Sequence, residues 1–231
     1  MMPRIVLLPG MHGSGKLFSA FMSMMPEPKH LEAIYYPADV SFSYGQLLGL
    51  VQSFVPVSDP YFLLAESFST PLAIQFAATN PPNLMGLILA AGFAASPIVG
   101  AQRLLASLLA PIIFRLPMSP IAIEYLLIGS NASEPLKQSV LDAVSSVKPE
   151  VLSARLRAVL TCDMRTDLSK VAAPTLYIRA TRDRLVHRNC LEEIQAALPQ
   201  TAVAEVDGPH LILQREPERT AEVVSDFVKQ F

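Results

Sequence analysis

Short uncharged runs rich in branched aliphatic residues alternate with longer amphipathic segments along most of the chain. The short runs have the composition of strands that are buried on both faces, and the longer segments have helical spacing. Strands are expected within residues 4–10, 32–39, 60–67, 84–93, 173–183 and 202–210, and helices within residues 15–25, 44–55, 71–80, 190–199 and 218–231. The sequence therefore predicts an α/β fold, with a mostly parallel sheet covered by helices on both faces.

The alternation stops between about Ser96 and Asp167. Helix-like segments fill this stretch, separated by prolines at positions 111, 117, 120, 135 and 149. We expect a helical cap at 96–165, inserted into a core formed by 1–95 and 166–231, at the sheet edge where ligands bind. Residues 104–128 are apolar nearly all round, so the apolar side chains that do not pack the cap onto the core are expected to line the space above the site.

Composition excludes several classes of function. The chain has 231 residues, of which 51% are hydrophobic, and this fits one domain with a modest insertion. A formal net charge of −2 without any lysine- or arginine-rich run argues against a nucleic-acid partner. Cys162 and Cys190 belong to no zinc-binding pattern, so no metal is expected and both are interpreted as ordinary thiols.

No membrane-inserted segment is expected. The apolar run after Arg4 is too short for a signal peptide, so we predict a cytoplasmic protein. A long uncharged stretch follows Glu66, but prolines interrupt it, and its longest part without proline, 83–96, is too short to cross a bilayer.

One serine lies where a strand passes directly into a helix. The uncharged strand at 60–67 ends in Ala-Glu-Ser-Phe-Ser, and Pro71 then stands in the first turn of a helix. A sharp turn of this kind exposes the serine hydroxyl and needs small residues on both sides, here Ala65 and Ser69. Ser67 is therefore the candidate nucleophile, although many helix N-caps have a similar sequence.

A histidine and an aspartate follow two later strands. His210 comes after the last predicted strand and could serve as the general base that a serine hydroxyl requires. Asp183 ends the strand before it and could fix the histidine tautomer. Taken singly, His210 could be a surface-loop residue and Asp183 a turn or cap residue. Asp163 is the competing acid, and His12 is the next candidate base.

The loop after the first strand contains a false motif. Gly10 to Lys16 matches the start of a phosphate-binding loop, but Leu17 occupies the position where magnesium binding requires serine or threonine. Nucleotide binding is therefore not expected.

Four segments together resemble landmarks of the α/β-hydrolase superfamily: LLPGMHGSGKLF, AESFS, ATRDRLV and GPHLILQREPE. They are similar to small serine esterase-like members with a helical cap, and they span Leu7 to Pro217. The resemblance implies a catalytic triad of Ser67, Asp183 and His210, and it implies no cofactor.

The resemblance also assigns the remaining site residues. It makes the backbone N–H groups of Met11 and Phe68 the oxyanion donors, with Gly10 and His12 shaping the loop. The chain departs from the usual pattern at Pro9, where many members have histidine, and at Ala65 and Ser69, which replace glycines. The antiparallel N-terminal strands of the superfamily are expected to be absent, which gives a reduced N-terminus.

These features predict a serine hydrolase that cleaves a small-molecule carboxylic ester with an apolar acyl or alcohol group, through an acyl-enzyme intermediate. Thioester, lactone, amide and carbon–carbon bonds remain alternative targets of the same triad. A non-catalytic binding protein on a hydrolase scaffold is an alternative from another class, because fold alone does not prove function. No oligomeric state is predicted.

Overall fold

Six parallel strands form a single sheet in the order β2–β1–β3–β4–β5–β6. The computed structural model describes residues 3–116 and 119–231. The strands are β1 (Arg4–Leu8), β2 (Leu31–Ala33), β3 (Tyr61–Glu66), β4 (Leu84–Ala90), β5 (Thr175–Ala180) and β6 (Ala202–Val206). The prediction of a mostly parallel α/β sheet is confirmed.

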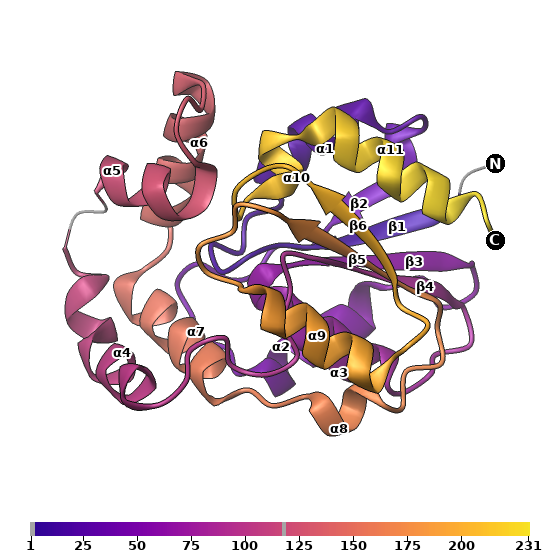
Figure 1. The fold of residues 1–231 in the computed structure, drawn as a ribbon, viewed down its shortest axis with the longest axis horizontal. Coiled ribbons are helices and arrows are strands. Elements are labelled where there is room, and N and C mark those ends of the chain that lie inside the picture. Colours follow the sequence, from indigo (N-terminus) through magenta and orange to yellow (C-terminus); the bar gives the residue numbers. More distant parts are fainter. Residues whose placement is uncertain (1–2, 117–118) are drawn as a thin grey trace.

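Helices cover both faces of this sheet (Figure 1). One face carries α1 (Ser19–Met24), α10 (Ile212–Arg215) and α11 (Pro217–Val228), and the other carries α2 (Tyr44–Phe54), α3 (Thr70–Ala77), α8 (Arg165–Leu168) and α9 (Arg188–Ala197). Successive strand residues point to opposite faces, so Ile5 and Leu7 pack in one core cluster while Val6 and Leu8 pack in the other. This is why the strands read as continuous apolar runs.

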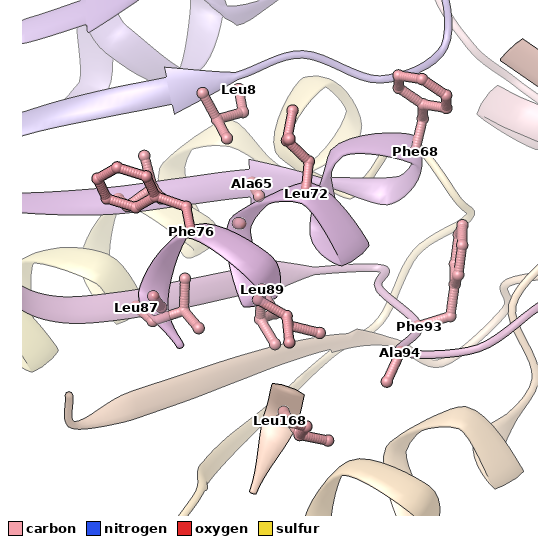
Figure 2. Close-up of a cluster of buried hydrophobic side chains, with 14 of the residues drawn as sticks. Leu8, Ala65, Phe68, Leu72, Phe76, Leu87, Leu89, Phe93, Ala94 and Leu168 are labelled. Atoms are coloured by element: carbon pink, nitrogen blue, oxygen red, sulfur yellow. The ribbon is translucent and has the colours of Figure 1, made fainter. Parts of the chain in front are cut away.

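The core layer beneath α3 extends to the edge of the sheet where the strands end. Figure 2 shows side chains of β1, β3 and β4 facing Leu72 and Phe76 of α3, with Phe68 and Phe93 beyond the ends of β3 and β4. Phe68 is 1% exposed, so the turn after β3 is anchored in the core. The backbone that carries Ser67 is therefore held by packing on its neighbour.

Four helices of the insertion between β4 and β5 lie beyond the carboxyl ends of the strands (Figure 1). They are α4 (Ala101–Ile113), α5 (Pro120–Ile123), α6 (Glu134–Ser145) and α7 (Pro149–Thr161). The chain leaves and re-enters the core side by side, because Ser96 N donates to Cys162 O at 3.2 Å and Met164 N donates to Ala94 O at 2.8 Å. These two hydrogen bonds support our division into a core and a cap at 96–165, which remains a proposal. Of the helices that the structure describes, none has the length and apolar character needed to traverse a bilayer.

Two expectations about local structure need correction. Pro120, Pro135 and Pro149 stand in the first turn of α5, α6 and α7, but Pro111 lies inside α4 instead of ending a segment. Because Pro111 is in the last turn, it removes one donor only, and Phe114 N still donates to Ala110 O at 3.2 Å. Pro117, with Met118, lies outside the described residues.

The second strand is shorter than the predicted 32–39. It ends at Ala33, and the chain beyond it pairs with the loop after β1, because Tyr36 N donates to Gly13 O at 2.9 Å. This brings Tyr36 next to the candidate site.

The two cysteines are free and buried, so no disulfide joins them. Burial raises the pKa of the Cys162 thiol to about 12 and that of the Cys190 thiol to about 11. Both thiols therefore stay protonated at neutral pH and are poor nucleophiles.

Candidate active site

Ser67 stands at a sharp turn between β3 and α3. Its φ is +50°, in the left-handed region that residues with a β-carbon rarely adopt. The hydroxyl of Thr70 donates to the Ser67 carbonyl at 2.8 Å and accepts from Phe93 N at 3.0 Å, which holds the turn against the end of β4. Such strain persists only where neighbouring structure fixes it, and it raises the Ser67 side chain above the sheet edge.

The structure brings Ser67, His210 and Asp183 into one hydrogen-bonded line. Nε2 of His210 lies 2.8 Å from Oγ of Ser67, and Nδ1 of His210 lies 2.7 Å from Oδ2 of Asp183. The other carboxylate oxygen of Asp183 accepts from the backbone N–H groups of Leu185 and Val186, at 2.8 and 3.0 Å. A carboxylate fixed in this way keeps the proton on Nδ1, so Nε2 is free to accept the serine proton.

The charge around His210 favours its protonated form. Burial alone would lower the pKa of the imidazole, but the charge and hydrogen bond of Asp183, together with the charge of Glu66, raise this pKa above its ordinary value. The histidine is 3% exposed, so water screens these charges little. An imidazolium formed during proton transfer from Ser67 is therefore stabilised.

Glu66 is a second buried carboxyl that the sequence analysis did not single out. It is 0% exposed, and one of its oxygens accepts from Gln214 Nε2 at 3.3 Å, while Oε1 has no partner among the described residues. Burial raises the pKa of Glu66 to about 7, against the opposing effects of His210 and Gln214. The signal was present in the sequence, where an acid ends an otherwise uncharged strand directly before the serine.

The two alternative residues have other contacts. Asp163 pairs with the side chain of Arg165 in an exposed position, and this hydrogen bond lowers the pKa of Asp163 to about 2. His12 is buried, and its Nδ1 accepts from Ser14 N at 3.0 Å. Burial, and then the charge of Arg155, lower the pKa of His12 to about 4, so this ring is neutral at ordinary pH.

The expected oxyanion loop lies beside Ser67. Gly10, Met11 and His12 line the same cavity as Ser67 and Phe68. The assignment of the Met11 and Phe68 N–H groups as oxyanion donors remains a prediction.

Two tyrosines hold the turn and the loop together. Tyr44 donates to the Phe68 carbonyl at 2.9 Å, and its ring stacks on that of Phe68 with centroids 5.1 Å apart. The fully buried Ser69 hydroxyl donates to the Pro9 carbonyl and accepts from the Tyr36 hydroxyl at 2.7 Å. Ser69 and Pro9, two departures from the usual pattern, thus connect the serine turn to the loop after β1.

Arg155 of α7 ties the insertion to this loop. Its side chain is among the largest that are fully buried, and it donates to the Met11 carbonyl at 2.8 Å and to the Pro37 carbonyl at 2.7 Å. Burial lowers the pKa of Arg155 to about 10, so it stays protonated at neutral pH. Gly13, at φ +71°, must be glycine because a β-carbon there would lie 2.8 Å from Nη1 of Arg155. The signal in the sequence is an arginine among mostly apolar residues in the buried stripe of a helix.

A cavity of about 630 Å³ opens above Ser67. Its lining is mostly apolar and includes Leu127, Val140, Val144, Leu152, Leu156 and Val159. The expectation that the leucines of the insertion line this space is wrong for α4, which contributes Gln102 and Ala106. The small residue Ala110 faces α7, so the leucines of α4 point the other way and are exposed.

Comparisons with known proteins place these features in context. The model of the family described as serine aminopeptidase, S33 matches residues 45–211, which include Ser67, Asp183 and His210. An esterase from Exiguobacterium antarcticum superposes with a TM-score of 0.84 at 16% identity, over 98% of this chain and 92% of that one. A thermophilic esterase from Thermogutta terrifontis gives 0.79 at 19% identity, over 99% and 90% of the two chains.

An enol-lactonase from Burkholderia xenovorans gives a TM-score of 0.78 at 16% identity, over 99% of this chain and 92% of that one. At these identities the likeness shows a common fold, that of the α/β-hydrolases. A search of curated protein sequences gives no match.

Proposed function

The chain belongs to the α/β-hydrolase family described as serine aminopeptidase, S33, and from this premise we propose that it is a serine hydrolase of carboxylic esters with an apolar acyl or alcohol group. The observation that carries the proposal is the line from Ser67 Oγ to His210 Nε2, at 2.8 Å, and from His210 Nδ1 to Asp183 Oδ2, at 2.7 Å. Both distances are within hydrogen-bonding range, as base-assisted attack requires.

In the proposed reaction, Oγ of Ser67 attacks the ester carbonyl carbon while His210 takes the hydroxyl proton. The carbonyl oxygen becomes an oxyanion, for which the N–H groups of Met11 and Phe68 are the proposed donors. The intermediate collapses, the alcohol leaves with the proton held by His210, and an acyl-serine remains. Water then gives its proton to His210, attacks the acyl carbon and releases the acid, after which Ser67 regains its proton.

The charge of the cavity favours an ester over the substrate of an aminopeptidase. An aminopeptidase must bind a free, positively charged amino group, which calls for an acidic partner. Among the described residues that line the cavity, none is aspartate or glutamate, and Arg184 adds a positive charge. Apolar lining residues instead suit an uncharged acyl or alcohol group, at about 0.8 kcal/mol for each buried methylene.

Thioesters, lactones and carbon–carbon bonds remain possible targets of the same triad, and a non-catalytic binding protein is the alternative from another class. A fluorophosphonate probe separates the enzyme from the binder, because only an activated serine reacts with it. We expect labelling of the wild type and none of Ser67→Ala. An unlabelled wild type would favour the binding protein.

Substrate choice is tested by kcat/KM for p-nitrophenyl acetate, butyrate, hexanoate and decanoate, with leucine p-nitroanilide as the competing aminopeptidase substrate. We expect kcat/KM to rise from acetate toward butyrate or hexanoate by up to about a hundredfold, and then to level off or fall when the cavity is full. A steady decline from acetate onward, or faster turnover of the anilide, would overturn the ester proposal.

A further inference from the structure

Helix α4 exposes the face that a helix of a water-soluble protein normally buries. Large apolar side chains recur along it at helical spacing, and all of them are exposed. Together with Leu116, three residues beyond the end of α4, we call them the leucine face: Leu104, Leu105, Leu108, Leu109, Ile112, Ile113 and Leu116. The exposed fractions of Leu104, Leu108 and Leu116 are 66%, 65% and 63%. A contiguous apolar surface of this kind marks a site of interaction.

The opposite face of α4 makes the contact with the rest of the protein. Ala110 is fully buried, and the Ser153 hydroxyl of α7 donates to its carbonyl at 3.2 Å. Small residues on this side let α4 pack closely on α7, and the packing leaves the leucine face pointing away from the core. The face is therefore outward-facing as a result of packing.

The leucine face adjoins the proposed active-site cavity. Val99, directly before α4, is 72% exposed and also lines the cavity above Ser67. Gln102 and Ala106, from the first half of α4, line it as well. The leucine face and the cavity above Ser67 therefore share a border. An apolar molecule released from whatever covers the leucine face would enter the cavity there.

The segment that carries the leucine face has basic but no acidic side chains. Between Glu66 and Glu124 the sequence has no acidic residue. Its only charged residues there are Arg103, in the first turn of α4, and Arg115, two residues beyond the end of α4. Glu150 lies 3.6 Å from Arg115, but both side chains are more than 60% exposed, and such a pair contributes little in water. The charge of Asp163 also acts on Arg103, so each of the two arginines has one acid near it, and Asp163 is itself exposed and pairs with Arg165.

The leucine face could be covered by a second copy of this chain or by a lipid bilayer, and the charges at its ends distinguish the two. A second copy bound through a two-fold axis would set the face against itself and bring arginines close to arginines, with no acid on α4 to pair with them. The surface of a bilayer with anionic headgroups offers an acyl layer for the leucines and negative charge for both arginines. Of the two coverings, the bilayer better complements the arginines, because the nearby acids Glu150 and Asp163 are exposed and pair weakly in water.

We infer that α4 docks on the surface of an anionic lipid bilayer, with the leucine face at the acyl boundary and Arg103 and Arg115 at the headgroups. The helix lies in the interface and does not cross the bilayer. The inference deepens the proposed function, on which its substrate part rests: the esters hydrolysed are lipid-like molecules that partition into the bilayer.

The binding test uses the full chain and sedimentation with vesicles of phosphatidylcholine, with and without phosphatidylglycerol. We expect binding to the mixed vesicles that weakens as salt is raised, and weak binding to phosphatidylcholine alone. The double variant Leu108→Glu/Ile112→Glu should bind at least about tenfold less. Val57→Glu is the matched control, because Val57 is 87% exposed on a loop of the core and should bind like the wild type.

The activity test compares two substrates. The wild type, the double variant and Val57→Glu should hydrolyse soluble p-nitrophenyl butyrate at rates within about twofold of one another. On an ester embedded in the mixed vesicles, the rate of the double variant should fall about tenfold. Ser67→Ala should bind vesicles as the wild type does and should hydrolyse neither ester. A wild type that binds the mixed vesicles but hydrolyses neither ester would reject the proposed function and leave the docking.

Docking itself is overturned if the wild type fails to sediment with mixed vesicles at low salt, or if the double variant sediments undiminished. It is also overturned if analytical ultracentrifugation finds a wild-type dimer that the double variant dissociates. In that case the covering of the leucine face is a second copy of this chain.

Discussion

Nε2 of His210 lies 2.8 Å from Oγ of Ser67, across 143 positions of sequence. Ser67→Ala removes the attacking oxygen and leaves the surrounding packing in place. Esterase kcat should fall by about 10⁴–10⁶, with the unfolding midpoint in urea nearly unchanged. The measurement is turnover of p-nitrophenyl butyrate alongside urea unfolding, and retention of more than about a tenth of the activity would assign the nucleophile elsewhere.

The acid limb of the pH profile should report His210. Only the neutral ring accepts the serine proton, so kcat/KM should fall as the pH drops below an ionisation that lies above the ordinary histidine pKa of 6.5. His210→Gln should abolish both activity and limb. His12→Gln serves as the comparison, because burial keeps His12 neutral and its loss should leave the limb where it is. A limb that vanished with His12 would move the base to that residue.

The two aspartates offer a matched pair for the orienting acid. Asp183→Asn should lower kcat by up to about 10⁴, because the amide permits the wrong imidazole tautomer. Asp163→Asn loses an exposed pair with Arg165 and should stay within about twofold of the wild type. Steady-state kinetics of the two variants decide the assignment, which would be reversed if Asp163→Asn were the more damaging change.

Glu66→Gln should make the protein more stable at alkaline pH and should make His210 a weaker base. The folded-state pKa of Glu66, about 7, lies above its ordinary value of 4.5, so the folded state holds this proton more tightly than the unfolded state does. The free energy of unfolding therefore falls as the pH rises from 4.5 to 7 and Glu66 ionises in the unfolded state first. Above pH 7 the buried Glu66 charge lowers the free energy of unfolding by on the order of 3 kcal/mol. Glutamine cannot ionise, so the variant should exceed the wild type in urea unfolding at about pH 8 and match it near about pH 4.

His12 has a lowered pKa, so its own pH effect has the opposite sign, but it is common to both proteins and cancels in the comparison. Loss of the Glu66 charge should also lower the kinetic pKa of His210. That kinetic shift is a readout that a purely structural role would leave unmoved. An unshifted profile, or a variant less stable than the wild type at about pH 8, would contradict the role given to Glu66.

The sequence sufficed for the sheet and for the grouping of Ser67, Asp183 and His210. Each of these residues follows a strand, and parallel strands all end at one edge, so topology alone brings them near one another. Ser69 and Arg155 escaped prediction because their roles depend on partners far away in sequence, at Pro9 and Met11.

The orientation of α4 was out of reach for a related reason. Its apolar periodicity identifies which side chains share a face, and the usual rule then turns that face inward. Only the packing of Ala110 against α7 shows that the face is outward. The length of β2 was likewise decided by a neighbour, since the chain after Ala33 pairs with the loop at Gly13.

The contact between Arg155 and the Met11 carbonyl divides the insertion into an inner layer that touches the loop beside Ser67 and an outer layer that does not. Changes in α7 are therefore expected to reach the loop beside Ser67 and to alter the rate of the proposed reaction. Changes on the outer surface of α4 meet α7 only through small residues and leave that loop untouched. A mutagenesis library confined to the outer layer should therefore redirect where the protein works and what is delivered to it, with the chemistry of the inner layer preserved.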